Sequence, residues 1–141
     1  MRIAIGSDHA GVEYKAALID YIQELGHEVK NFGTDSTESV DYPDFIRPVA
    51  EAVARGEYER GVILGGSGNG EQMVANKVHG IRCALCWDTT TARLSRQHND
   101  ANMVSIGQRV VGLETARDVI KVFLSTDFEG GRHARRIAKM E

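Results

Sequence analysis

The sequence has 141 residues, of which 42% are hydrophobic and 26% charged, a balance that predicts one compact domain over residues 1–141 and excludes disordered, collagen-like and coiled-coil chains. The formal net charge of -3 gives no overall attraction for nucleic acid or an anionic membrane, so neither is expected as a partner. The chain shows no signal peptide and no apolar run near the roughly 20 residues of a spanning helix, so a cytoplasmic protein is expected.

Short apolar runs, which predict strands, alternate along the chain with three- and four-residue apolar periodicity, which predicts helices. In chain order we expect a strand at Arg2–Ile5, a helix at Ala10–Leu25, a strand at His27–Phe32, a helix from Pro43 to Gly56, a strand at Gly61–Leu64, a helix at Glu71–Val78, a strand at Ile81–Trp87, a helix at Thr89–Gln97, a strand at Met103–Ile106, a helix at Leu113–Leu124 and one more from Gly130. Crossovers of this kind predict an α/β fold, a Rossmann-like three-layer sandwich with a five-stranded, mostly parallel sheet.

A glycine-rich run, Gly65–Gly70, follows the third predicted strand and opens a helix. Its backbone N–H groups and the helix N-terminus can therefore face an anion. The phosphate-binding lysine of a P-loop is missing because Glu71 stands at its position, and the same residue breaks the dinucleotide-binding glycine pattern. These substitutions disfavour binding of ATP, GTP or a dinucleotide.

Glu71 itself has two interpretations. A carboxylate in the first turn of a helix is a favourable partner of the helix dipole, which needs no function. The alternative is a general base beside an oxyanion hole, because carbanion chemistry needs a proton acceptor next to hydrogen-bond donors.

Other polar residues also allow two interpretations. Asp8 and His9 end the first strand, either as a helix cap with an exposed neighbour or as part of a site. His98 and Asn99 precede the fifth strand, at the opposite edge of the sheet, and alone would be a polar turn. The basic C-terminal third is a solvated face or a phosphate clamp of guanidinium groups, and contains Arg109, Arg132, His133, Arg135 and Arg136.

The two cysteines, Cys83 and Cys86, lie within a predicted strand, where residues three apart point to opposite faces. We therefore expect both in the core. No second pair of ligands has zinc spacing, so no metal and no cofactor is expected.

Taken together, the polar motifs resemble those of the type B ribose-5-phosphate isomerase family, which includes allose- and galactose-6-phosphate isomerases. The motifs run in order along nearly the whole chain: Ser7-Asp8-His9-Ala10-Gly11, Asp41-Tyr42-Pro43-Asp44, Gly66-Ser67-Gly68-Asn69-Gly70, Ala75-Asn76-Lys77, His98-Asn99-Asp100-Ala101-Asn102 and Glu129-Gly130-Gly131-Arg132-His133. The resemblance implies interconversion of aldose and ketose phosphates through a cis-enediolate, without metal, in homodimers or dimers of dimers whose active sites lie between subunits.

The resemblance also implies a role for each candidate site residue. Asp8 and His98 would open the sugar ring, and Tyr42 and Asn99 would contact the sugar. The phosphate would be held by His9, Arg109, Arg132 and Arg136. The enediolate oxygens would be stabilised by Ser67 and the N–H groups around Gly66, Gly68 and Gly70.

One residue departs from the pattern of many family members, which carry a cysteine base just after the third strand. Here that position is Gly65, and neither cysteine lies in the loop. A second branch of the family has a glutamate after the glycine run, where this chain has Glu71. The resemblance therefore assigns proton transfer between C1 and C2 to Glu71.

Three functions remain open at this point. The first is isomerisation of ribose 5-phosphate and ribulose 5-phosphate, and the second is isomerisation of a related four- or six-carbon sugar phosphate. The third is a sugar-phosphate or nucleotide sensor without catalysis. A sensor has no use for a base beside the glycine loop, so Glu71 favours an enzyme.

Overall fold

The computed structural model describes residues 1–141, whose five strands form one all-parallel sheet in the order β2-β1-β3-β5-β4. The strands are β1 (Arg2–Ser7), β2 (Glu28–Asn31), β3 (Arg60–Gly65), β4 (Cys83–Leu85) and β5 (Met103–Gly107). At the centre of the sheet, Ile5 pairs with Val62 and Val62 with Val104. The central strands are buried almost throughout because helices cover both faces, which explains their unbroken apolar runs.

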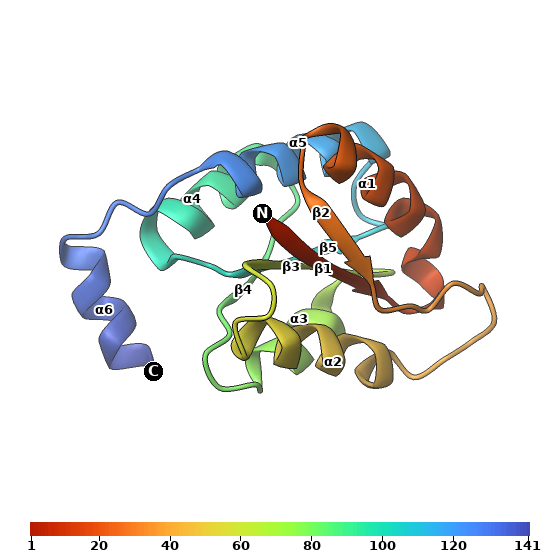
Figure 1. Ribbon diagram of the computed structural model, residues 1–141, viewed down its shortest axis with the longest axis horizontal. Coiled ribbons are helices and arrows are strands. Elements are labelled where there is room, and N and C mark those ends of the chain that lie inside the picture. Colours follow the sequence, from red (N-terminus) through yellow and green to blue (C-terminus); the bar gives the residue numbers. More distant parts are fainter.

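Two layers of helices enclose the sheet (Figure 1). One face carries α1 (Val12–Glu24), α4 (Thr89–Asn99) and α5 (Leu113–Ser125), and the other carries α2 (Tyr42–Ala54) and α3 (Asn69–Asn76). Leu18 and Phe123 pack with Ile5 in the first core, whereas Ile46 packs with Ile63 in the second. The predicted three-layer, Rossmann-like sandwich is confirmed.

The last helix, α6 (Arg132–Met140), lies outside this sandwich and packs beside α4 (Figure 1). An ion pair of 2.6 Å between Arg82 Nη1 and Glu141 ties its C-terminal end to the start of β4. No helix in the structure has the length and apolar character needed to cross a membrane.

Most predicted boundaries differ from the structure by one or two residues, and two of these differences have a clear physical cause. The strand expected at Ile81–Trp87 is only Cys83–Leu85, because it lies at the sheet edge and pairs with β5 alone. The helix expected from Glu71 starts at Asn69, because a left-handed backbone at Gly68, with φ of 83°, turns the chain into the helix two residues earlier.

The strand order creates one point where the chain reverses its direction of winding. From β1 the chain crosses outward to β2, whereas from β3 it crosses the other way toward β4 and β5. Open parallel sheets bind ligands outside the carboxyl ends of the strands at such a point. Asp8 follows β1 and the glycine loop follows β3, so both motifs lie at this reversal.

Candidate active site

The first carboxyl group at the reversal belongs to Asp8, which directly follows β1. Asp8 is 7% exposed, and its Oδ1 accepts a hydrogen bond of 2.8 Å from the Ala10 N–H, which caps a short 3₁₀ helix, His9–Gly11. Asp8 therefore caps a helix, as the first interpretation expected, but His9 is partly buried rather than simply exposed. The cap uses Oδ1, and Oδ2 carries no hydrogen bond from another group of the backbone.

The second carboxyl group belongs to Glu71, in the first turn of α3. Its side chain is 4% exposed and folds back over the end of β3, so that a Cβ atom added at Gly65 would lie 2.0 Å from Oε1. Burial, together with hydrogen bonding to Asp8, raises the pKa of Glu71 to about 7. A carboxylate that served only the helix dipole would be exposed and ionised, whereas this group exchanges a proton near neutral pH.

The glycine loop that leads into α3 carries unpaired hydrogen-bond donors. The N–H groups of Ser67, Gly68 and Gly70 donate no hydrogen bond to any other group of the chain, while the Asn69 N–H donates to Ser67 Oγ at 3.2 Å. The Gly68 carbonyl is fixed by the Ser105 hydroxyl at 2.8 Å, so the loop is held in place. Such an arrangement can stabilise an oxyanion.

Two more side chains lie against the loop, and His9 directly follows Asp8. The ring of Tyr42 lies against Gly70, where an added Cβ would be 2.7 Å from the ring, and the guanidinium of Arg109 lies beside Gly66 in the same way, at 3.2 Å. His9 accepts a hydrogen bond of 3.1 Å from the Val40 N–H at Nδ1, so its Nε2 carries the proton and can donate. The structure therefore brings together the sequence-predicted residues Asp8, His9, Tyr42, Gly66, Ser67, Gly68, Gly70, Glu71 and Arg109.

The remaining candidates lie at the opposite end of the sheet. Asn99 ends α4 and its carbonyl accepts a hydrogen bond from Arg82, just before β4, while the neighbouring Asn102 carbonyl accepts from Gly61 at the start of β3. His98, Arg132 and Arg136 stand on α4 and α6 at this same end. A single chain does not unite these residues with Asp8 and Glu71.

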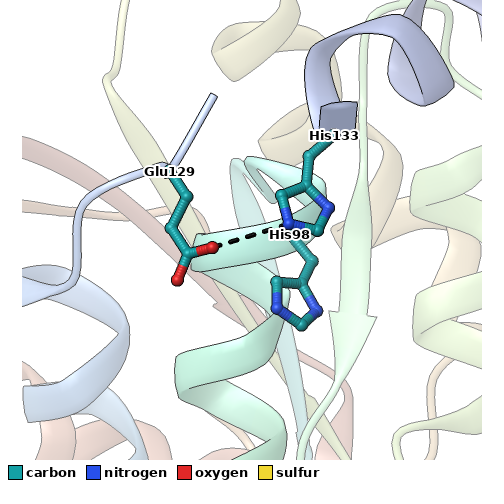
Figure 2. A group of neighbouring side chains, drawn as sticks. All are labelled: His98, Glu129 and His133. Atoms are coloured by element: carbon teal, nitrogen blue, oxygen red, sulfur yellow. Dashed lines mark ion pairs between the residues drawn. The ribbon is translucent and has the colours of Figure 1, made fainter. Parts of the chain in front are cut away.

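The structure also assembles a cluster that the sequence did not predict. His98 and His133 stack with ring centroids 4.4 Å apart, and Glu129 Oε2 lies 3.5 Å from His133 Nε2 (Figure 2). Burial and the nearby Arg132 lower the pKa of His133. Glu129 and His133 are four residues apart, a spacing that signals proximity, but the third member is distant in sequence and is brought in by folding.

Both cysteines are buried, as predicted, and on opposite faces of the sheet. Cys83 belongs to the core beneath α2 and α3, and Cys86 to the core beneath α1, α4 and α5. Neither cysteine lies in the glycine loop, although Cys86 lines a small cavity of about 190 Å³ together with Ser67 and Asn69.

Comparison with known proteins decides the family. The family model described as "Ribose/Galactose Isomerase" matches residues 3–140. The chain belongs to this family. It is 44% identical over 136 residues to ribose-5-phosphate isomerase B of Escherichia coli strain K12, covering 96% of this chain and 91% of that protein. It is 40% identical over 141 residues to D-erythrulose-4-phosphate isomerase of Pectobacterium atrosepticum, covering 99% and 93%.

A solved structure of ribose-5-phosphate isomerase B from Clostridium thermocellum superimposes on this chain with a TM-score of 0.98. The two sequences are 51% identical, and the match covers 99% of this chain and 95% of the other. The family membership and the fold together establish that the chain is an isomerase.

Proposed function

We propose that the chain is a metal-independent isomerase that interconverts ribose 5-phosphate and ribulose 5-phosphate through a cis-enediolate. The observation that carries this proposal is the carboxyl of Glu71, buried beside unpaired N–H donors with a pKa of about 7. A base whose pKa lies near the working pH both accepts and returns a proton efficiently. Because the chain supplies the proton acceptor and the oxyanion donors, this route has no step that calls for a metal.

Glu71 transfers the proton in this proposal. In the open-chain aldose, its carboxylate removes the proton from C2 while the electron pair of that bond forms the C1–C2 double bond of the enediolate. Negative charge develops on the carbonyl oxygen at C1, where Ser67 and the N–H groups of Gly68 and Gly70 donate hydrogen bonds. Glu71 then returns the proton to C1, while the proton of the C2 hydroxyl passes to the adjacent C1 oxygen of the cis-enediolate, so that the C2 oxygen becomes the carbonyl of the ketose.

The cyclic sugar must first open. Asp8 stands beside Glu71, and a second proton-transfer group is needed because the anomeric hydroxyl loses a proton while the ring oxygen gains one. We assign this second role to His98 of a second subunit. Tyr42 and Asn99 contact the sugar hydroxyls, and His9, Arg109, Arg132 and Arg136 bind the phosphate. Asn99, Arg132 and Arg136 belong to the same subunit as His98, and the other residues belong to the subunit that supplies Glu71.

A homodimer follows from this assignment, and the surface supports it. A groove of about 850 Å³ runs beside the edge strand β4, between α3, α4 and the end of α6. Met140, which lines it, is 60% exposed, and Met73 on α3 is 63% exposed. A groove with a mixed apolar and polar lining beside the sheet edge suits a second copy of the chain, and a dimer of dimers would extend the same assembly.

A related substrate is the second candidate. The relative from Pectobacterium atrosepticum carries a name that specifies a four-carbon sugar phosphate, at 40% identity over 141 residues. The proton-transfer chemistry at C1 and C2 is the same for four, five or six carbons. Comparing kcat/KM over a panel of aldose phosphates of these lengths distinguishes the candidates.

The deciding experiment replaces the base. In Glu71→Gln the amide keeps the shape of the side chain but cannot accept the C2 proton, so kcat falls by roughly 10² to 10⁴-fold while substrate binding persists. Exchange of the C2 hydrogen with solvent, measured by NMR, should be lost together with turnover. The matched control is Glu24→Gln, an exposed glutamate of α1. Normal turnover in Glu71→Gln would refute the assignment of the base.

A further inference from the structure

The cluster of His98, Glu129 and His133 lies at the junction of α4 and α6, at the opposite end of the sheet from Asp8 and Glu71 of the same chain (Figure 2). The nitrogen and oxygen atoms that these residues offer as ligands all lie within 4.8 Å of one another. Two imidazoles and a carboxylate form a donor set that binds Zn²⁺ in many proteins, with a fourth position left for water. The cluster therefore has the composition of an open metal site.

Backbone contacts hold the three residues together. The Glu129 N–H donates a hydrogen bond of 3.1 Å to the carbonyl of Gln97, the residue before His98. This bond fixes the segment that leads into α6 against the end of α4. His133 follows in the first turn of α6, and its ring stacks on His98 at 4.4 Å between centroids. The cluster is thus a consequence of the fold and not of three independent surface side chains.

One atom in the cluster lacks a partner. His133 is 5% exposed, and its Nε2 is buried without any hydrogen bond. Glu129 Oε2 is the nearest carboxylate oxygen, at 3.5 Å. A buried nitrogen without a partner costs free energy, which a bound cation would recover. His133 Nε2 therefore points to a ligand at this place.

We propose that His98, Glu129 and His133 bind one divalent transition-metal ion, with Zn²⁺ as the best match, and that this metal inhibits the enzyme by holding His98. Zn²⁺ forms bonds of about 2.0 to 2.2 Å with imidazole nitrogen and carboxylate oxygen. The stacked rings, only 14° from parallel, must splay apart so that their lone pairs converge. His98 is half-buried and Glu129 exposed, so both can move toward the fixed His133.

The surroundings set the strength of this site. Arg132 and Arg136 lie close enough to His133 to repel a cation, so we expect weaker binding than at a site without neighbouring positive charge, and an inhibitory ion rather than a permanent one. The inhibition rests on the function proposed above, because it requires His98 to take part in ring opening. The binding of the metal itself does not depend on the proposed function.

Binding is tested with the metal alone on the full-length, chelator-treated protein. Calorimetry with Zn²⁺ should show one ion per chain, and Co²⁺ should give the visible absorption bands of a four- or five-coordinate site. In His98→Ala and in Glu129→Gln the affinity should fall by roughly tenfold or more, since even loss of outer-sphere partners costs that much. His79→Ala, which removes an exposed histidine outside the cluster, should bind as the wild type does.

Both test residues are at least partly exposed, so their variants should fold, and thermal melting verifies this. Absence of one-to-one binding, or equal binding by wild type, His98→Ala and Glu129→Gln, would overturn the metal site.

The isomerase assay then separates the two proposals. Zn²⁺ should lower wild-type turnover reversibly, with recovery on adding chelator, and should leave the residual turnover of Glu129→Gln unchanged. A wild-type protein that binds the metal but loses no activity would overturn the inhibition and leave the proposed isomerisation intact. Metal binding by a chain without isomerase activity would remove the proposed function and keep the metal site.

Discussion

At the end of β3, Glu71 and Gly65 share one small volume. The carboxylate occupies the space that a side chain at position 65 would fill, with Oε1, Oε2 and Cδ all within 2.5 Å of an added Cβ. Gly65 is not in a left-handed backbone conformation, so the backbone does not require a glycine here. Its lack of a side chain instead leaves room for the Glu71 carboxyl. The glycine is thus part of the chemistry of the proposed site.

Gly65→Ala tests this sharing of space. The added methyl group displaces a flexible carboxylate and no backbone atom, so we expect stability to change little while kcat falls by roughly 10²-fold or more. The control is Gly112→Ala, since a Cβ at Gly112 meets nothing within 4 Å. Thermal melting and steady-state kinetics measure the two effects, and an unimpaired kcat in Gly65→Ala would show that Glu71 can work from another position.

The pH dependence of turnover follows from the raised pKa of Glu71. The base form is required, and burial holds the pKa of this carboxyl at about 7, so kcat/KM should rise as pH increases through that value. At about pH 6 only about a tenth of the carboxyl is ionised. Steady-state kinetics from about pH 5.5 to about pH 8.5 measures this limb, whose apparent pKa belongs to Glu71 and Asp8 as a pair. A flat profile would contradict the assignment.

The sequence could identify Glu71 as a base candidate because its place after a glycine run is local information. The packing of its carboxyl over Gly65 and against Asp8 joins residues far apart in the chain. Burial, and with it the pKa, depends on these contacts and could not be derived from the sequence.

Among the elements, β4 shows how a strand edge is closed without another strand. The Asn76 side chain accepts a hydrogen bond of 2.8 Å from the Cys83 N–H and donates one of 2.9 Å to the Cys83 carbonyl. These two bonds replace the pairing that a further strand would supply, so the exposed edge is short. The sequence predicted that a strand lies here but not its length, because an apolar run does not reveal which neighbours pair with it.

The position of the cysteines around β4 predicts slow reaction with iodoacetamide. Burial raises the pKa of Cys86 to about 11 and that of Cys83 still further, so little thiolate exists at neutral pH. Mass spectrometry should show both thiols unmodified in the folded protein, with activity retained, and both modified in denaturant. Rapid stoichiometric inactivation that substrate prevents would instead place a cysteine in the site.

At the scale of the whole molecule, the candidate site falls into two groups. Asp8 and Glu71 lie at the carboxyl ends of strands, whereas His98 and Asn99 precede β5, about one strand length away, on the order of 17–20 Å. Element order and the edge to which each motif belongs could be predicted from the sequence, since the alternation of strands and helices fixes them. The order of strands in the sheet and the place of α6 outside it depend on tertiary packing, so they could not be predicted from the sequence.

A mixing experiment tests whether two chains share each site. Glu71→Gln and His98→Ala subunits, each inactive alone, should regain activity when refolded together, because one site of each heterodimer carries both changes and the other carries neither. Equal mixing should restore about a quarter of wild-type activity. Refolding each variant by itself is the control. Absence of recovery despite verified heterodimers, or full activity of a dilute monomer, would refute shared sites.

Because Glu71 occupies the space that a side chain at position 65 would fill, the order of substitutions by which such a site can evolve is restricted. In an ancestor with a thiol base at position 65, a glutamate at position 71 is tolerated, since its flexible side chain turns outward. A later change of position 65 to glycine would make the room that Glu71 occupies here, so that in the proposed mechanism the carboxylate could take over proton transfer. The other order passes through a chain with no base at all, so a path between the two kinds of enzyme, in either direction, keeps a base throughout only if it passes through a chain that carries both the thiol and the glutamate.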